Sequence, residues 1–144
     1  PQSDKIARRA GIGVSFGIGH RHNVSEALPG AKQTSARAEL AAAVRAIGLW
    51  QRYEPTLDLH LYSDNTYAIG EVNRILKPKE HKQFTGHRPN HDLVKELERL
   101  LNIRTAEIKV FKEVPAHSDD LLNDDADALA NTAARKAYEL SRKK

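Results

Sequence analysis

The sequence predicts a mixed-sheet α/β domain with strands and helices in the order β-β-α-β-α-α-β-α. Short segments alternate apolar and polar residues, as strands do, and longer segments repeat apolar residues every three or four positions, as helices do. Gly or Pro separates most of these segments. The chain has 144 residues, a length that fits one domain, so we expect residues 1–144 to form a single domain.

The first half of the chain predicts a hairpin, a long helix and a central strand. Residues 10–17 alternate large apolar residues with Gly and Ser, and residues 24–28 follow a turn as the second arm. Residues 35–53 are rich in Ala and have apolar residues at helical spacing, and Pro55 ends this helix. Residues 57–64 alternate Leu with polar residues and predict the next strand.

The second half predicts three helices and one strand. Residues 66–76 form a short amphipathic helix that stops before a Pro. Asn90 can cap the next helix. One face of that helix is formed by Leu93, Leu97, Leu100 and Leu101. Residues 108–114 predict the last strand, and residues 123–141 predict a closing helix with Ala and Leu at helical spacing.

Composition excludes several classes of protein. The chain is 40% hydrophobic and 29% charged, as globular domains are, and it has no cysteine for a disulfide or a thiolate metal site. No apolar segment is long enough to span a membrane and none at the start looks like a signal, so we expect an intracellular protein. A net charge of +4 permits a polyanionic partner.

Three acidic residues stand out by position. Glu39 lies near the start of the first helix, Asp64 ends the central strand, and Asp127 lies near the start of the last helix. Open α/β sheets place their sites at the carboxyl ends of strands, as for Asp64. Acidic residues are also common near helix starts because they interact favourably with the helix dipole. Each of these acids taken alone is therefore weak evidence for a functional site. Asn123 is four residues before Asp127 and shares its face.

The local sequence around these acids is more specific. Residues 11–13 read Gly-Ile-Gly, residues 34–39 read Thr-Ser-Ala-Arg-Ala-Glu, and residues 62–65 read Tyr-Ser-Asp-Asn. Residues 115–118 read Pro-Ala-His-Ser, and residues 123–130 read Asn-Asp-Asp-Ala-Asp-Ala-Leu-Ala. In this order, the segments resemble the motifs of the cellular type of ribonuclease H. The resemblance implies that family's fold, a ribonuclease H-like mixed β-sheet flanked by helices.

The resemblance also implies an activity and a site. It implies an endonuclease that cleaves the RNA strand of an RNA–DNA hybrid with two divalent ions, Mg²⁺ or Mn²⁺. Glu39, Asp64 and Asp127 match three of the family's four acidic metal ligands. His117 matches a loop histidine that assists proton movement or product release. The substrate-binding positions that match are Ser35, Asn65 and Asn123.

The sequence departs from the family pattern at its start. The family's fourth carboxylate ends a first strand, and counting back from Gly11 runs past Pro1, while Asp4 follows no apolar segment. The chain also begins without Met, so we expect the natural sequence to continue upstream. In the family this strand lies between the strands that residues 11–17 and 57–63 match, and here we expect it from those upstream residues, from a separate peptide or from a partner chain. Without its carboxylate the second metal site is impaired.

Other departures leave a second function open. The family's Asn at the first helix start is Ser35 here and is followed by Ala36, and the Gly beside the loop histidine is Ala116. These changes favour a module that has lost catalysis and binds nucleic acid or serves as a scaffold in a ribonucleoprotein or reverse transcriptase assembly. Residues 77–88 form a basic loop that can replace the family's basic substrate-binding element. Retention of the three acids favours the enzyme.

Overall fold

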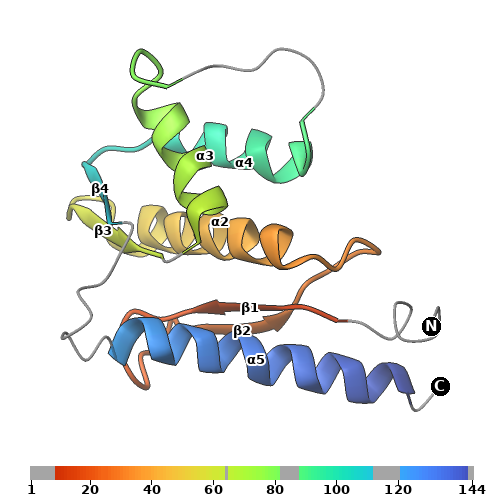
Figure 1. Cartoon of the computed structure of the whole chain (residues 1–144). Helices are drawn as coiled ribbons and strands as arrows, with labels where there is room; N and C mark the ends of the chain where they lie inside the picture. The colour runs from red at the N-terminus through yellow and green to blue at the C-terminus, as the bar shows by residue number, and fades with distance from the viewer. Residues whose placement is uncertain (1–8, 64, 82–87, 112–120, 143–144) are drawn as a thin grey trace. The chain divides into compact units, whose positions relative to one another are not determined.

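The computed structural model describes residues 9–63, 65–81, 88–111 and 121–142 (Figure 1). The order of elements in these ranges is β-β-α-β-α-α-β-α, which agrees with the predicted order and confirms the α/β class. The chain divides into two compact units, Pro1–Ala42 with Asp119–Lys144, and Ala43–Ser118. The single domain over residues 1–144 stays a prediction.

The first unit contains a two-stranded antiparallel hairpin. Strand β1 (Gly11–Val14) pairs with β2 (Val24–Ala27). The predicted strand over residues 10–17 ends earlier, because the chain turns after Val14. There the Asn23 side chain accepts a hydrogen bond from the Phe16 backbone N–H at 2.8 Å and donates one to the Gly17 carbonyl at 2.6 Å.

Helix α5 (Leu121–Arg142) packs on this hairpin and lies along it (Figure 1). Ile12 is buried, whereas Gly11 and Gly13 alternate with it and meet the helix. A Cβ atom at Gly13 would overlap the carbonyl oxygen of Ala126. The helix backbone and the strand backbone are therefore in direct contact.

Helix α2 (Ser35–Tyr53) has the predicted bounds. It begins where the Thr34 hydroxyl accepts a hydrogen bond from the Arg37 backbone N–H at 3.2 Å, which satisfies a donor that the helix leaves unpaired. Leu40 and Ile47 are fully buried. Residues of this helix as far as Ala42 belong to the first unit, and the rest belong to the second.

The second unit contains a parallel strand pair. Strand β3 (Leu59–Tyr62) pairs with β4 (Ile108–Phe111). The predicted strand over residues 57–64 begins later because Leu57 is exposed, and its carbonyl accepts a 2.6 Å hydrogen bond from the Trp50 indole N–H. Of the predicted strand over residues 108–114, positions 112–114 lie outside the described residues.

Two helices complete the second unit. Helix α3 (Thr66–Leu76) has its predicted bounds and packs against α4 (His91–Asn102) and β4. The buried face of α4 consists of Val94, Leu97, Leu100 and Leu101. The predicted face was therefore wrong at Leu93, which is half-buried. No helix in the described ranges is long and apolar enough to cross a membrane.

The strands of the described ranges form two separate pairs, β1 with β2 and β3 with β4. One pair is antiparallel and the other is parallel. Direct pairing of β1 with β3 would have contradicted the predicted strand between them, and the described residues show no such pairing. That further strand remains a prediction.

Candidate active site

Two of the four predicted catalytic residues lie within the described ranges. Glu39 is half-buried in α2, and Asp127 is exposed in α5. Both belong to the first unit. Asp64 and His117 lie outside the described residues, as does Asp4. Convergence of the three acids therefore stays a prediction.

The packing of α2 fixes the backbone at Glu39. Its two neighbours in sequence, Ala38 and Leu40, are buried with 6% and 0% of their surface exposed. The Thr34 cap holds the first turn of the same helix. Glu39 is thus a half-exposed carboxylate on a well-anchored turn. The predicted substrate-binding Ser35 is exposed at the first position of this helix.

The start of α5 is held by the hairpin. The Ser15 hydroxyl donates a 2.6 Å hydrogen bond to the Asp125 carboxylate, and the Ser25 hydroxyl donates a 2.6 Å hydrogen bond to the Leu129 carbonyl. These two bonds lie on either side of Asp127 in the sequence. The predicted substrate-binding Asn123 belongs to this helix, and its side chain lies outside the described ones.

The residues on both sides of Asp64 have defined positions. The Ser63 backbone N–H donates to the Phe111 carbonyl at 3.2 Å, which extends the strand pairing by one bond. The Asn65 side chain accepts a 2.9 Å hydrogen bond from the Ala68 backbone N–H and caps α3. This capping role was missed in the sequence, although Asn is a favoured cap. A substrate contact by Asn65 remains a prediction.

The donor chemistry of the two described acids suits a hard divalent ion. Glu39 and Asp127 are carboxylates with access to solvent, and Mg²⁺ prefers such oxygen ligands. In the part of the chain that the structure describes, no group of three or more His, Asp or Glu side chains could hold a metal ion. The predicted ligand set includes Asp64, which lies outside that part, so the set stays a prediction.

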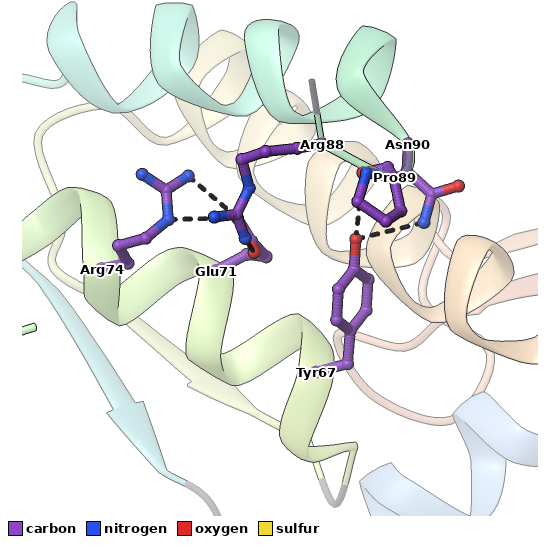
Figure 2. Close-up of polar contacts among 6 residues, drawn as sticks. All are labelled: Tyr67, Glu71, Arg74, Arg88, Pro89 and Asn90. Carbon is purple, nitrogen blue, oxygen red and sulfur yellow. Dashed lines mark hydrogen bonds and ion pairs between the residues drawn. The ribbon is translucent and has the colours of Figure 1, made fainter. Parts of the chain in front are cut away.

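A buried charge cluster in the second unit was not predicted from the sequence. Glu71 on α3 is only 4% exposed. Its carboxylate pairs with Arg74 at 2.9 Å and, through its other oxygen, with Arg88 (Figure 2). Burial of a charge is tolerated when partners of opposite charge bind it. A Glu within the apolar stripe of a helix is the signal that could have found it.

Two further hydrogen bonds fix the residues that follow Arg88. The Asn90 side chain donates to the Tyr67 hydroxyl at 3.1 Å, and that hydroxyl donates to the Pro89 carbonyl at 3.4 Å (Figure 2). Tyr67 and Glu71 are one turn apart on α3, so one face of this helix holds the start of α4.

This arrangement corrects two expectations. Asn90 occupies the position before α4, but its side chain makes no capping bond and its φ is 58°, a left-handed conformation that Asn tolerates. Arg88 is not an exposed member of the basic loop, because its side chain is 16% exposed and pairs with Glu71. Positions 82–87 of that loop lie outside the described residues.

We expect Glu71→Gln to lower the free energy of unfolding by about 3 kcal/mol, because it removes a buried counter-charge from two half-buried arginines. Urea denaturation measures this loss. Glu96→Gln is the matched control, since Glu96 also pairs with an arginine three residues later but is 42% exposed. Water screens the control pair, so its removal should change stability little. Equal losses of unfolding free energy in both variants would show that the Glu71 ion pairs stabilise the fold no more than an exposed pair does.

Comparison with known proteins identifies relatives over most of the chain. The RNase H family model matches residues 2–135, a range that includes all four predicted catalytic residues. Mouse ribonuclease H1 is 33% identical over 133 residues, which cover 90% of this chain and 45% of that protein. Ribonuclease H of Schizosaccharomyces pombe is 33% identical over 129 residues, which cover 87% of this chain and 46% of that protein.

A bacterial relative has a more similar length. Ribonuclease H of Chlorobium chlorochromatii is 33% identical over 108 residues, which cover 72% of this chain and 70% of that protein. By contrast, the chain spans about half the length of the mouse and fission yeast relatives.

Proposed function

Because this chain belongs to the ribonuclease H family, we propose that it is the nuclease domain of an endonuclease that hydrolyses the RNA strand of an RNA–DNA hybrid. The observation that carries this proposal is the family match over residues 2–135. The matched range contains Glu39, Asp64, His117 and Asp127 in the order that the family motifs require.

In this proposal the three acids, Glu39, Asp64 and Asp127, hold Mg²⁺ or Mn²⁺. Divalent ions in such a site supply a hydroxide-like nucleophile and neutralise charge on the leaving oxygen. The anchored turn beneath Glu39 and the hairpin beneath the start of α5 support the proposal, because metal ligands must be held by rigid elements.

In this proposal the remaining site residues transfer protons or bind the substrate. His117 accepts or donates a proton near neutral pH, where imidazole titrates. Ser35, Asn65 and Asn123 carry hydroxyl or amide groups that hydrogen-bond to the nucleic-acid backbone or base edges. Exposure of Ser35 at the start of α2 supports this role. The chain's positive charge favours binding to a polyanion.

A strand between β1 and β3 completes the sheet in this proposal and contributes a fourth carboxylate. In the described ranges β1 pairs with β2 and β3 pairs with β4, so each strand has a second edge to which a further strand can add. Each buried backbone group left without a partner costs about 1–3 kcal/mol, so an added strand is strongly favoured. Residues upstream of Pro1, a separate peptide or a partner chain can supply it.

The decisive experiment compares the 144-residue chain with a longer form, extended at its amino end by a segment that supplies the proposed strand and its carboxylate. Both are incubated with a labelled RNA–DNA hybrid in Mg²⁺ or Mn²⁺. We expect the longer form to cleave only the RNA strand and the shorter form to be at least about 10–100-fold slower, because in this proposal the added strand carries a metal ligand.

Single-stranded RNA, double-stranded DNA and excess EDTA serve as controls in this experiment. Binding of the hybrid without cleavage by the longer form would refute the nuclease and favour the scaffold function. Equal cleavage rates in both forms would refute the proposal that the added strand contributes a fourth carboxylate to the site.

A further inference from the structure

The hairpin forms hydrogen bonds to α5 at two positions, one on each side of Asp127 in the sequence. Ser15 follows β1 and bonds the Asp125 side chain, whereas Ser25 lies in β2 and bonds the Leu129 carbonyl, both at 2.6 Å. The partners are 110 and 104 residues apart in the sequence. These are tertiary contacts that hold one turn of the helix in place.

Backbone contacts also prevent helix α5 from lying any closer to strand β1. Gly11 and Gly13 face α5, and an added Cβ at either position would overlap the carbonyl oxygen of Ala130 or Ala126. Contacts between backbones leave no flexible side chain that could absorb a shift. The hairpin therefore fixes the position of residues 125–130 through direct backbone contacts.

Ser15 is itself held so that its proton points toward α5. Its oxygen accepts a 3.2 Å hydrogen bond from the Gly17 backbone N–H. The turn is further fixed by Asn23, which bonds to Phe16 and Gly17. A hydroxyl whose acceptor side is occupied in this way directs its hydrogen to the remaining partner, the Asp125 carboxylate.

Helix geometry separates the anchoring acid from the exposed one. Successive residues are about 100° apart around a helix, so Asp125 and Asp127 lie about 200° apart. In agreement, Asp125 is half-buried against the hairpin and Asp127 is exposed. Fixing Asp125 therefore fixes the direction in which Asp127 projects.

From this geometry we propose that Ser15 is a positioning residue for the metal site: through Asp125 it fixes the early turns of α5 and so the carboxylate of Asp127. The inference rests on the proposed nuclease function. Helix starts fray, and a ligand that moves by more than about 0.5 Å loses its productive geometry. The bond thus keeps Asp127 in place before metal and substrate arrive.

The first test is independent of metal and activity. Amide hydrogen exchange is measured in the metal-free protein for wild type, Ser15→Ala and Asp125→Ala. A hydrogen bond to a charged group is stronger than one between neutral groups, so we expect amides of residues 125–128 to exchange at least about tenfold faster in both variants. Amides of α4 serve as the internal reference. Unchanged exchange in residues 125–128 would overturn the proposal.

The second test separates positioning from general stability. In the extended form, if it cleaves the hybrid, we expect Ser15→Ala to lower kcat about tenfold and to raise the Mg²⁺ concentration for half-maximal activity, with KM for the hybrid unchanged. Asp125→Asn keeps an oxygen that can accept the Ser15 hydrogen bond, so this variant should retain most of the wild-type activity. Asp124→Ala removes an exposed acid from the same turn and should match wild type.

The outcomes distinguish this inference from the proposed function. If wild type cleaves and Ser15→Ala cleaves equally well, the positioning role is wrong and the nuclease stands. If Asp125→Asn is as slow as Ser15→Ala, the charge of Asp125 matters rather than the hydrogen bond, and the inference is also wrong. If the wild-type longer form does not cleave, the proposed function fails and the positioning role fails with it.

Discussion

If the chain is the proposed nuclease, Asp127→Asn is expected to lower metal-dependent cleavage of an RNA–DNA hybrid by the extended form at least about 100-fold. Asn keeps the size of the side chain but removes the negative charge that binds a divalent ion. Because Asp127 is exposed, its replacement should change the free energy of unfolding by less than about 0.5 kcal/mol. Initial rates across a range of Mg²⁺ concentrations, with thermal unfolding in parallel, measure both effects.

Asp124→Asn is the matched control for this substitution, since it removes the same charge from an exposed position three residues earlier in α5. We expect its cleavage rate to equal that of wild type. A similar loss in both variants would mean that overall negative charge at the helix start matters, and not a ligand at position 127.

Gly13→Ala is expected to lower the free energy of unfolding by more than about 3 kcal/mol. The new methyl group would overlap the Ala126 carbonyl, and its next neighbours are also backbone atoms of α5. Backbone atoms cannot rotate away as a side chain can, so the helix must move off the hairpin. Chemical denaturation followed by circular dichroism measures the loss.

Gly70→Ala provides the control for this prediction. Gly70 lies in α3, where an added methyl group would meet nothing within 4 Å, and it has an ordinary helical conformation. Ala is favoured over Gly in a helix by about 0.5–1 kcal/mol, so this variant should be slightly more stable than wild type. Equal stability of Gly13→Ala and wild type would show that β1 and α5 are not in direct backbone contact.

The elements that depend on local sequence were predicted well. Helices α2 and α3 have the predicted bounds, because their apolar residues recur at helical spacing and Pro55 and Pro78 follow their ends. Such signals act within a few residues, so they can be read from the sequence without knowledge of the fold. The alternation in β1 and β3 likewise identified the buried faces.

Contacts between distant residues were not predictable in the same way. Strand lengths were overestimated because other hydrogen bonds replace the strand pairing at strand ends, as at Leu57, whose carbonyl accepts from Trp50 seven residues earlier. Asn90 was assigned to a cap, but Tyr67, 23 residues away, binds its side chain instead. A local pattern cannot show which of two hydrogen-bond partners a side chain will meet.

The sequence by itself determined the order of elements, the family, and the acids and histidine expected in the site. Only the tertiary structure decided that Glu71 is buried between two arginines and that the Ser15 hydroxyl binds Asp125. Arg88 and Asp125 have the same charged groups as any surface residue of their type. Their environment depends on segments 17 and 110 residues away, which folding brings together and which no local periodicity encodes.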